Sequence, residues 1–173
     1  MNKFLVFDVS KLIDQSTGSR DEYSFEGPVK FEGMTLKAPV TGHVEIMKIE
    51  EGVNVNVTNL ETKAEFTCDR CLKLYTQPIL VKSAERIFHK EPPKNVEDLS
   101  DLYMMNKKHL NVDISEMLRQ EIILHFPLNL VCSSGCKGLC TICGKDKNKG
   151  TCKCKVAEVE EYKPLSKLKE LLK

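Results

Sequence analysis

Eight cysteines carry the strongest chemical signal in this 173-residue chain. They are Cys68, Cys71, Cys132, Cys136, Cys140, Cys143, Cys152 and Cys154. The Cys68/Cys71 and Cys140/Cys143 pairs have the Cys-x-x-Cys spacing, which lets one tight turn point two sulfurs at one ion. Four thiolates placed tetrahedrally form the usual closed zinc site, so eight thiols predict one or two structural Zn²⁺ ions with all eight as ligands.

The spacing favours one partition of these ligands and leaves another open. Cys140, Cys143, Cys152 and Cys154 are joined by a polar, turn-rich link over 144–151 that can fold back, so we assign them to one site. The other four, from Cys68 to Cys136, would then form a second site across 61 positions. Alternatively, the local run at 132, 136, 140 and 143 forms one site, and the last two cysteines join the first two.

The first pair also has readings without zinc. Cys68 and Cys71 could be a reduced, partly buried pair, because free cysteine behaves as a small hydrophobic residue. Arg70 between them could lower a thiol pKa, as in a redox motif, but such motifs precede a helix, and here the flanks are typical of two strands of a hairpin. No secretory signal is recognised at the start, so we expect a reducing cytoplasm and no disulfide framework.

Positive charge is concentrated around the last six cysteines. Formal net charge is −3 over 1–60, −1 over 61–131, +5 over 132–155 and zero over 156–173. The basic residues of the positive stretch are Lys137, Lys145, Lys147, Lys149, Lys153 and Lys155. Lysines contact phosphates without reading sequence, so they are candidate nucleic-acid contacts, although a four-thiolate zinc site would subtract charge from the same tip.

Most of the first 90 residues follow a strand pattern. Strands are predicted at 3–9 and 22–26, and period-two valines such as Val53, Val55 and Val57 predict a longer hairpin over 39–68. A returning strand over 75–88 contains Pro78, which favours an edge position or a bulge. The result is an antiparallel meander that places the first cysteine pair at a hairpin tip.

One main helix and two less regular segments follow. Residues 113–126 predict a helix with Asp113 as N-cap, an apolar stripe that includes Met117, Leu118 and Ile122, and His125 in a capping or packing role near its end. Residues 90–108 predict a polar connector with a possible short helix. The tail over 163–173 predicts a short amphipathic helix that packs on its own domain or docks on a partner.

Composition limits the classes of protein that this chain can belong to. With 41% hydrophobic and 29% charged residues it is globular, and no apolar run approaches the roughly 18–20 residues of a membrane-spanning helix. We therefore predict an α+β protein in three parts: a β-rich partial barrel with one helix over 1–131, a zinc-binding module over 132–155 and an amphipathic tail over 156–173.

Three motifs together resemble a known family. They are Cys68-Asp69-Arg70-Cys71-Leu72 after a strand, a helix over 114–126, and the run from Cys136-Lys137-Gly138-Leu139-Cys140 to Cys143-Gly144. In this combination the chain resembles the bacterial and plastid YceD family of large ribosomal RNA subunit accumulation proteins. The resemblance implies a β-rich protein with a helical segment and a role in synthesis, processing or stability of 23S ribosomal RNA.

The residues and the resemblance predict a non-enzymatic ribosome-assembly factor that binds large-subunit ribosomal RNA or a ribosomal protein. The alternative is a zinc-stabilised protein-interaction adaptor with no direct RNA contact. An enzyme is disfavoured, because four-thiolate zinc has no open coordination position and no catalytic motif accompanies it. Neither a membrane nor a small-molecule substrate is expected.

Overall fold

The computed structural model describes residues 3–92, 102–106 and 108–154. Its main feature is a five-stranded sheet in the order β2 (Arg20–Gly27), β3 (Val40–Ile49), β4 (Gly52–Thr67), β5 (Leu74–His89) and β6 (Tyr103–Met104). The first four strands are antiparallel neighbours, whereas β6 runs parallel to the last two residues of β5. The predicted β-rich α+β meander is therefore confirmed.

A second, small sheet and three short helices complete the described chain. A 3-10 turn, η1 (Lys3–Leu5), leads into β1 (Val6–Asp8), which pairs with β7 (Asn111–Asp113). Helix α1 (Ser10–Ile13) and helix α2 (Ser115–Leu124) are the two α-helices. None of the helices in the described ranges has the length and apolar character that a bilayer crossing requires.

The core lies between one face of the large sheet and the helices. Side chains alternate along β4, so Val53, Val55 and Val57 are completely buried while Asn54 and Asn56 point to the other face. Met117 and Leu118 of α2 are also completely buried, and α2 packs on β5. Burying one such aliphatic side chain stabilises the fold by about 1.5–3 kcal/mol, so this face holds the sheet and helix together.

The helix differs in detail from its prediction over 113–126. Asp113 ends β7 instead of capping α2: its carboxylate accepts the Ser115 N–H at 2.9 Å, and no side chain caps the helix at Ile114. The N-cap assignment was wrong, because pairing with β1 keeps Asp113 in extended backbone. At the other end the His125 ring nitrogen Nδ1 lies 2.8 Å from the Glu121 carbonyl oxygen, which agrees with the capping role.

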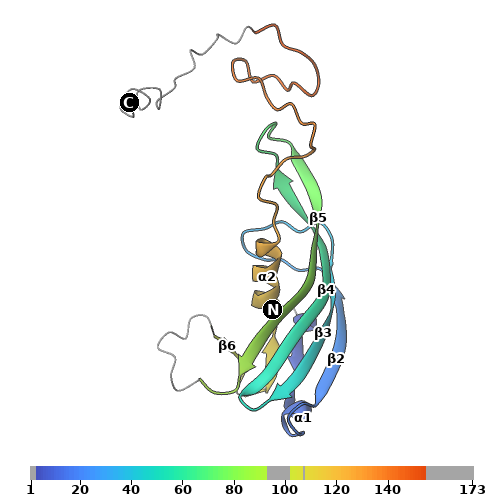
Figure 1. Ribbon diagram of the computed structural model, residues 1–173, viewed down its shortest axis with the longest axis vertical. Coiled ribbons are helices and arrows are strands. Elements are labelled where there is room, and N and C mark those ends of the chain that lie inside the picture. The colour runs from blue at the N-terminus through green and yellow to red at the C-terminus, as the bar shows by residue number, and fades with distance from the viewer. Residues whose placement is uncertain (1–2, 93–101, 107, 155–173) are drawn as a thin grey trace, which may run out of the picture.

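The long β4–β5 hairpin carries the cysteine-rich segment at its far end. Figure 1 shows this hairpin extending beyond the rest of the sheet, with residues 131–154 at its tip and α1 at the opposite end of the molecule. Pro78 pairs with Lys63 of β4, at a point where β5 has no second neighbour within the described residues, so its edge position is confirmed. The amphipathic tail over 156–173 and part of the connector, 93–101 and 107, lie outside the described residues.

Candidate metal centres

The first cysteine pair lies in the tight turn between β4 and β5. The Leu72 N–H donates to the Cys68 carbonyl at 2.8 Å, and the Cys68 N–H donates to the Lys73 carbonyl at 2.9 Å. Leu72 closes the turn with a left-handed φ of 59°. Both thiols are buried, Cys68 completely.

The Cys140/Cys143 pair repeats the same backbone pattern. The Gly144 N–H donates to the Cys140 carbonyl at 2.9 Å, and the Cys140 N–H donates to the Lys145 carbonyl at 2.8 Å. Gly144 takes the place of Leu72, with φ of 70°. Two turns 72 positions apart thus present their sulfurs in the same way, which is the arrangement expected of two half-sites for metal.

Backbone contacts hold the segment over 130–139 against the hairpin tip, which is the turn between β4 and β5. The Asp69 N–H donates to the Leu130 carbonyl at 2.8 Å, and the Leu139 N–H donates to the Arg70 carbonyl at 2.8 Å. The Arg70 guanidinium also donates to the Cys136 carbonyl at 3.0 Å. The sequence suggested Arg70 as a residue that lowers a thiol pKa. In the structure it also holds the segment over 136–139 against the hairpin.

These contacts gather the eight cysteines into two groups of four. The hairpin cluster contains Cys68, Cys71, Cys132 and Cys136, and the tail cluster contains Cys140, Cys143, Cys152 and Cys154. Within each group all four sulfurs lie within 4.8 Å of one another. This is the partition that the spacing favoured, and the alternative with 132, 136, 140 and 143 in one site is not the one formed.

Sulfur separations in the hairpin cluster fit a tetrahedral ion. The Cys68 and Cys136 sulfurs are 3.9 Å apart, and the Cys71 and Cys132 sulfurs are 3.7 Å apart. Four sulfurs about 2.3 Å from a central Zn²⁺ would be separated by about 3.8 Å along each edge of the tetrahedron. The cysteines are free thiols rather than disulfides, whose sulfurs would be about 2 Å apart.

Electrostatics in the hairpin cluster also favour a cation. Burial opposes ionisation of Cys68, but the N–H groups of Cys132, Cys71 and Arg70 outweigh it and lower the pKa of this thiol to about 6. The Lys73 N–H favours the Cys71 thiolate, yet burial and the neighbouring thiols raise its pKa to about 12. The Cys68 thiolate forms readily, and its negative charge then opposes ionisation of Cys71. A divalent cation between the sulfurs would offset this repulsion.

The tail cluster shows the same contrast between thiols. The N–H groups of Cys143 and Ile142 lower the pKa of Cys140 to about 6. Hydrogen bonding to Cys143, burial and the negative charges of Cys143 and Cys140 raise the pKa of Cys154 to about 12. Both clusters therefore fit a soft divalent ion by donor type, spacing and charge, and binding of zinc itself stays a prediction.

The predicted lysines surround these clusters. Of those described, Lys137, Lys145, Lys149 and Lys153 are exposed and Lys147 is half-buried, while Lys155 lies outside the described residues. Lys145 Nζ donates to the Thr151 carbonyl at 3.4 Å, and no salt bridge within the described residues involves this set. Among the described residues, the ammonium groups of Lys137, Lys149 and Lys153 have no acidic partner, so they are available to an anionic ligand.

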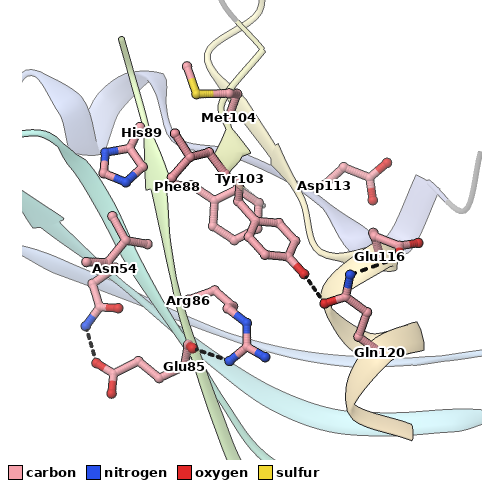
Figure 2. Close-up of a pocket in the computed structure, with 12 residues that line it drawn as sticks. Asn54, Glu85, Arg86, Phe88, His89, Tyr103, Met104, Asp113, Glu116 and Gln120 are labelled. Atoms are coloured by element: carbon pink, nitrogen blue, oxygen red, sulfur yellow. Dashed lines mark hydrogen bonds between the residues drawn. The ribbon is translucent and has the colours of Figure 1, made fainter. Parts of the chain in front are cut away.

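A cavity of about 930 Å³ lies at the opposite end of β5, and sequence reasoning missed it (Figure 2). It lies beside β6 and α2, and three carboxylates line it, those of Glu85, Asp113 and Glu116. Arg86 also lines the cavity, and its charge is neutralised by Glu121, with Nη2 and Oε1 2.6 Å apart. No pattern in the sequence announces it, because it forms where a parallel two-residue strand meets a helix.

Comparisons with known proteins agree on one family. Residues 57–172 match the family described as "Large ribosomal RNA subunit accumulation protein YceD". The chain is 38% identical over 60 residues to "Large ribosomal RNA subunit accumulation protein YCED homolog 1, chloroplastic" of Arabidopsis thaliana, and 42% identical over 55 residues to the protein of that name from Zea mays. These matches cover 34% and 31% of this chain, and only 19% of the length of each relative. No solved structure matches the chain significantly.

Proposed function

The chain belongs to the YceD family, and from this premise we propose that it is a non-catalytic ribosome-assembly factor that supports synthesis, processing or stability of 23S ribosomal RNA. The observation that carries the proposal is the extent of the family match. Residues 57–172 include both cysteine clusters and all six lysines of the positively charged stretch over 132–155. The features that distinguish this chain chemically thus lie within the part that it shares with the family.

Each cysteine cluster holds one structural Zn²⁺ in this proposal. Bound zinc supplies a rigid crosslink without redox chemistry. In the hairpin cluster it joins the β4–β5 turn to a segment more than 60 residues later, and in the tail cluster it closes the loop over 144–151. Because the thiols must stay reduced, the protein works in a reducing compartment, which we take to be the cytoplasm.

The basic tip, by which we mean residues 132–154 at the end of the β4–β5 hairpin, contacts RNA through phosphates. The exposed lysines, Lys137, Lys145, Lys149 and Lys153, surround a zinc-braced loop, so their positions are constrained without loss of exposure. Ammonium groups fix a protein on the backbone and carry no base readout. We propose that this tip recognises large-subunit RNA by its charge and shape.

The donor sets argue for a binding protein rather than an enzyme. Four thiolates complete the tetrahedral coordination of zinc, so no position is left at which a water or substrate oxygen could be activated. At the acidic cavity, the Glu116 carboxylate is engaged by Arg119 at 2.7 Å. This ion pair suits a structural role for Glu116 better than proton transfer.

The proposal is tested by metal analysis and crosslinking. The reduced, purified protein should contain two zinc ions per chain, and a Cys140→Ser/Cys143→Ser variant should retain one. Crosslinking in cells should recover 23S ribosomal RNA attached to peptides from 132–155. Purified protein without bound metal, or crosslinks that map only to proteins, would contradict the metal and RNA parts respectively.

A second candidate is favoured by the acidic cavity. Glu85 and Asp113 line it without an ion pair in the described residues, and the net charge of 1–131 is negative. A basic segment of a ribosomal protein would complement this surface, so the chain would act as a protein-interaction adaptor. In that case Glu85→Gln/Asp113→Asn should abolish association with the ribosomal protein, while changes to the tip lysines should leave it intact.

A further inference from the structure

Asn148 lies in the loop that joins two halves of the tail cluster, but its side chain contacts the hairpin cluster. It lies in the link between Cys143 and Cys152, whose thiols belong to the tail cluster. Its side-chain Nδ2 nevertheless lies 3.5 Å from the sulfur of Cys136, within hydrogen-bonding distance. No other side-chain amide donates to a cluster sulfur within the described residues.

The hydrogen-bond network fixes the orientation of this amide. Asn148 Oδ1 accepts the Lys137 N–H at 2.8 Å, and Nδ2 donates to Asp146 Oδ1 at 2.8 Å as well as to Cys136. The Asn148 backbone N–H donates to the same Asp146 oxygen at 2.9 Å. With its oxygen and both amide hydrogens engaged, the side chain cannot flip without losing contacts.

The loop that carries Asn148 is held against the hairpin cluster along its length. Leu139 and Asp146 form an antiparallel bridge, and the Lys147 N–H donates to the Gly138 carbonyl at 2.9 Å. The Leu139 N–H in turn donates to the Arg70 carbonyl on the hairpin tip. The loop closed by the tail cluster is thus continuous with the backbone around Cys136.

We propose that Asn148 is a positioning residue of the hairpin cluster, supplied by the loop of the tail cluster, and that it couples metal binding at the two clusters. The inference rests on the proposed function in one respect, that both clusters bind a divalent ion. A four-thiolate site with one divalent ion keeps a formal charge of −2, and N–H donors to its sulfurs stabilise that charge. Metal in the tail cluster orders the loop and so holds the donor in place.

Loss of an outer-shell partner of this kind typically lowers metal affinity about 10- to 100-fold. Asn148→Ala should therefore weaken metal binding at the hairpin cluster at least tenfold, although no ligand has changed. Asn148→Asp should weaken it further, because it keeps the acceptor oxygen for the Lys137 N–H while it replaces the donor with a negative charge beside Cys136. Thr151→Ala, an exposed change in the same loop, is the matched control.

Coupling between the two clusters predicts a second effect, which a hydrogen bond without coupling would not produce. By linkage, metal in the tail cluster raises the affinity of the hairpin cluster by the same factor as the reverse. Cys152→Ser/Cys154→Ser should therefore also weaken the hairpin cluster about tenfold. In the Asn148→Ala background the same pair of changes should have no further effect, because the link is already broken.

The experiment uses ¹¹³Cd²⁺ as the probe on the full-length, reduced chain. Each cluster gives its own cadmium resonance, assigned with the cysteine variants, and competition with a chelator gives the affinity of each. The proposal is supported by a tenfold or larger loss at the hairpin cluster in Asn148→Ala and by the non-additive double-mutant cycle. It is overturned if Asn148→Ala and Asn148→Asp bind within twofold of wild type, or if the effects of Asn148→Ala and the cysteine changes multiply.

The two proposals fail in distinguishable ways. Wild-type protein that binds two cadmium ions, with an unaffected Asn148→Ala variant, removes only the coupling. Wild-type protein that binds none removes the metal part of the proposed function and the coupling with it. Dispersed amide resonances from the β4 and β5 strands, recorded on the same samples, show that each variant is folded.

Discussion

Three glycines in the cysteine-rich segment differ in two constraints on substitution, a left-handed φ and a close contact to the Cβ that a larger residue would add. Gly138 has a φ of 69°, and a Cβ there would lie 2.8 Å from the Arg70 carbonyl oxygen, a backbone atom that accepts the Leu139 N–H. Gly144 has a φ of 70° but open space around it, and Gly135 has neither constraint. The three positions therefore form a graded series for one kind of substitution.

Alanine in this series should act in the order Gly138, Gly144, Gly135. Gly138→Ala combines a left-handed backbone with a clash and should cost about 2–5 kcal/mol locally, whereas Gly144→Ala should cost about 1–2 kcal/mol. Hydrogen exchange of the Leu139 amide measures the effect of Gly138→Ala directly, because this N–H donates to the Arg70 carbonyl on the hairpin. Equal protection of this amide in Gly138→Ala and Gly135→Ala would show that the contact with the hairpin does not need glycine.

The first turn of α2 offers a prediction about pH. The Arg119 guanidinium, 2.7 Å from the Glu116 carboxylate, is the main cause that holds the pKa of Glu116 below its usual 4.5. A lowered pKa in the folded state means that this carboxylate stabilises the fold above the unfolded value, and that the contribution is lost as pH falls through the folded value. The stabilisation is small, because Glu116 is half-exposed.

Arg119→Gln should raise the pKa of Glu116 toward 4.5, as measured by NMR titration of its side-chain carboxyl carbon. Gln120, whose side chain also donates to Glu116, provides the control: Gln120→Ala should raise the pKa less, since its hydrogen bond is the weaker cause. A pKa of Glu116 that does not move in Arg119→Gln would assign the shift to the helix rather than to the ion pair.

At the scale of elements, α2 is the apolar cover of the sheet. Leu118 is completely buried, and Leu128, four residues beyond the end of the helix, is completely exposed. Leu118→Ala should lower the free energy of unfolding by about 2–5 kcal/mol because it leaves a cavity, while Leu128→Ala should change it by less than about 0.5 kcal/mol. Urea unfolding followed by circular dichroism compares the two, and similar midpoints would mean that α2 is not part of the cooperative core.

Elements that depend on local pattern could be predicted from the sequence, and elements that depend on distant partners could not. Period-two valines in β4 and the apolar stripe of α2 place side chains on one face whatever the partner, so Val55 and Leu118 were correctly expected in the core. Asp113 was misread because its neighbour β1 lies more than 100 positions earlier, and that pairing decides its backbone conformation.

The candidate site divides in the same way. The partition of cysteines could be predicted, because the short polar link over 144–151 lets Cys140, Cys143, Cys152 and Cys154 form a local site and leaves the other four for the hairpin. The contact between Asn148 and Cys136 had no signal, since an asparagine in a lysine-rich loop is typical of any turn. The acidic cavity likewise arises only once β6, β7 and α2 meet.

At the scale of the whole molecule, charge is separated along the long axis. The body over 1–131 has a net charge of −4, whereas 132–155 has +5, and the described part of that stretch, 132–154, lies at the tip of the long hairpin (Figure 1). Two four-thiolate zinc sites would subtract from that positive charge, so only lysines that extend away from the sulfurs can serve a polyanion. The acidic body should repel the same polyanion and thereby leave the tip as the surface that meets it.

A salt titration tests whether this tip carries the RNA affinity. Each phosphate contact to single-stranded RNA adds about −0.7 to the slope of log affinity against log salt. Replacing Lys137, Lys145 and Lys149 with glutamine should therefore make the slope less steep by about 2 and lower affinity about 100-fold at 0.1 M salt. Fluorescence anisotropy with a fragment of 23S ribosomal RNA measures both quantities.

The matched control removes the same charge from the body. Lys30, Lys63 and Lys82 are exposed and lie outside the tip, so their replacement with glutamine changes net charge equally. If position along the molecule decides binding, this control keeps the wild-type slope and loses little affinity, because long-range repulsion is screened beyond about 10 Å at 0.1 M salt. Equal losses in both triple variants would mean that total charge, and not the zinc-braced tip, attracts the RNA.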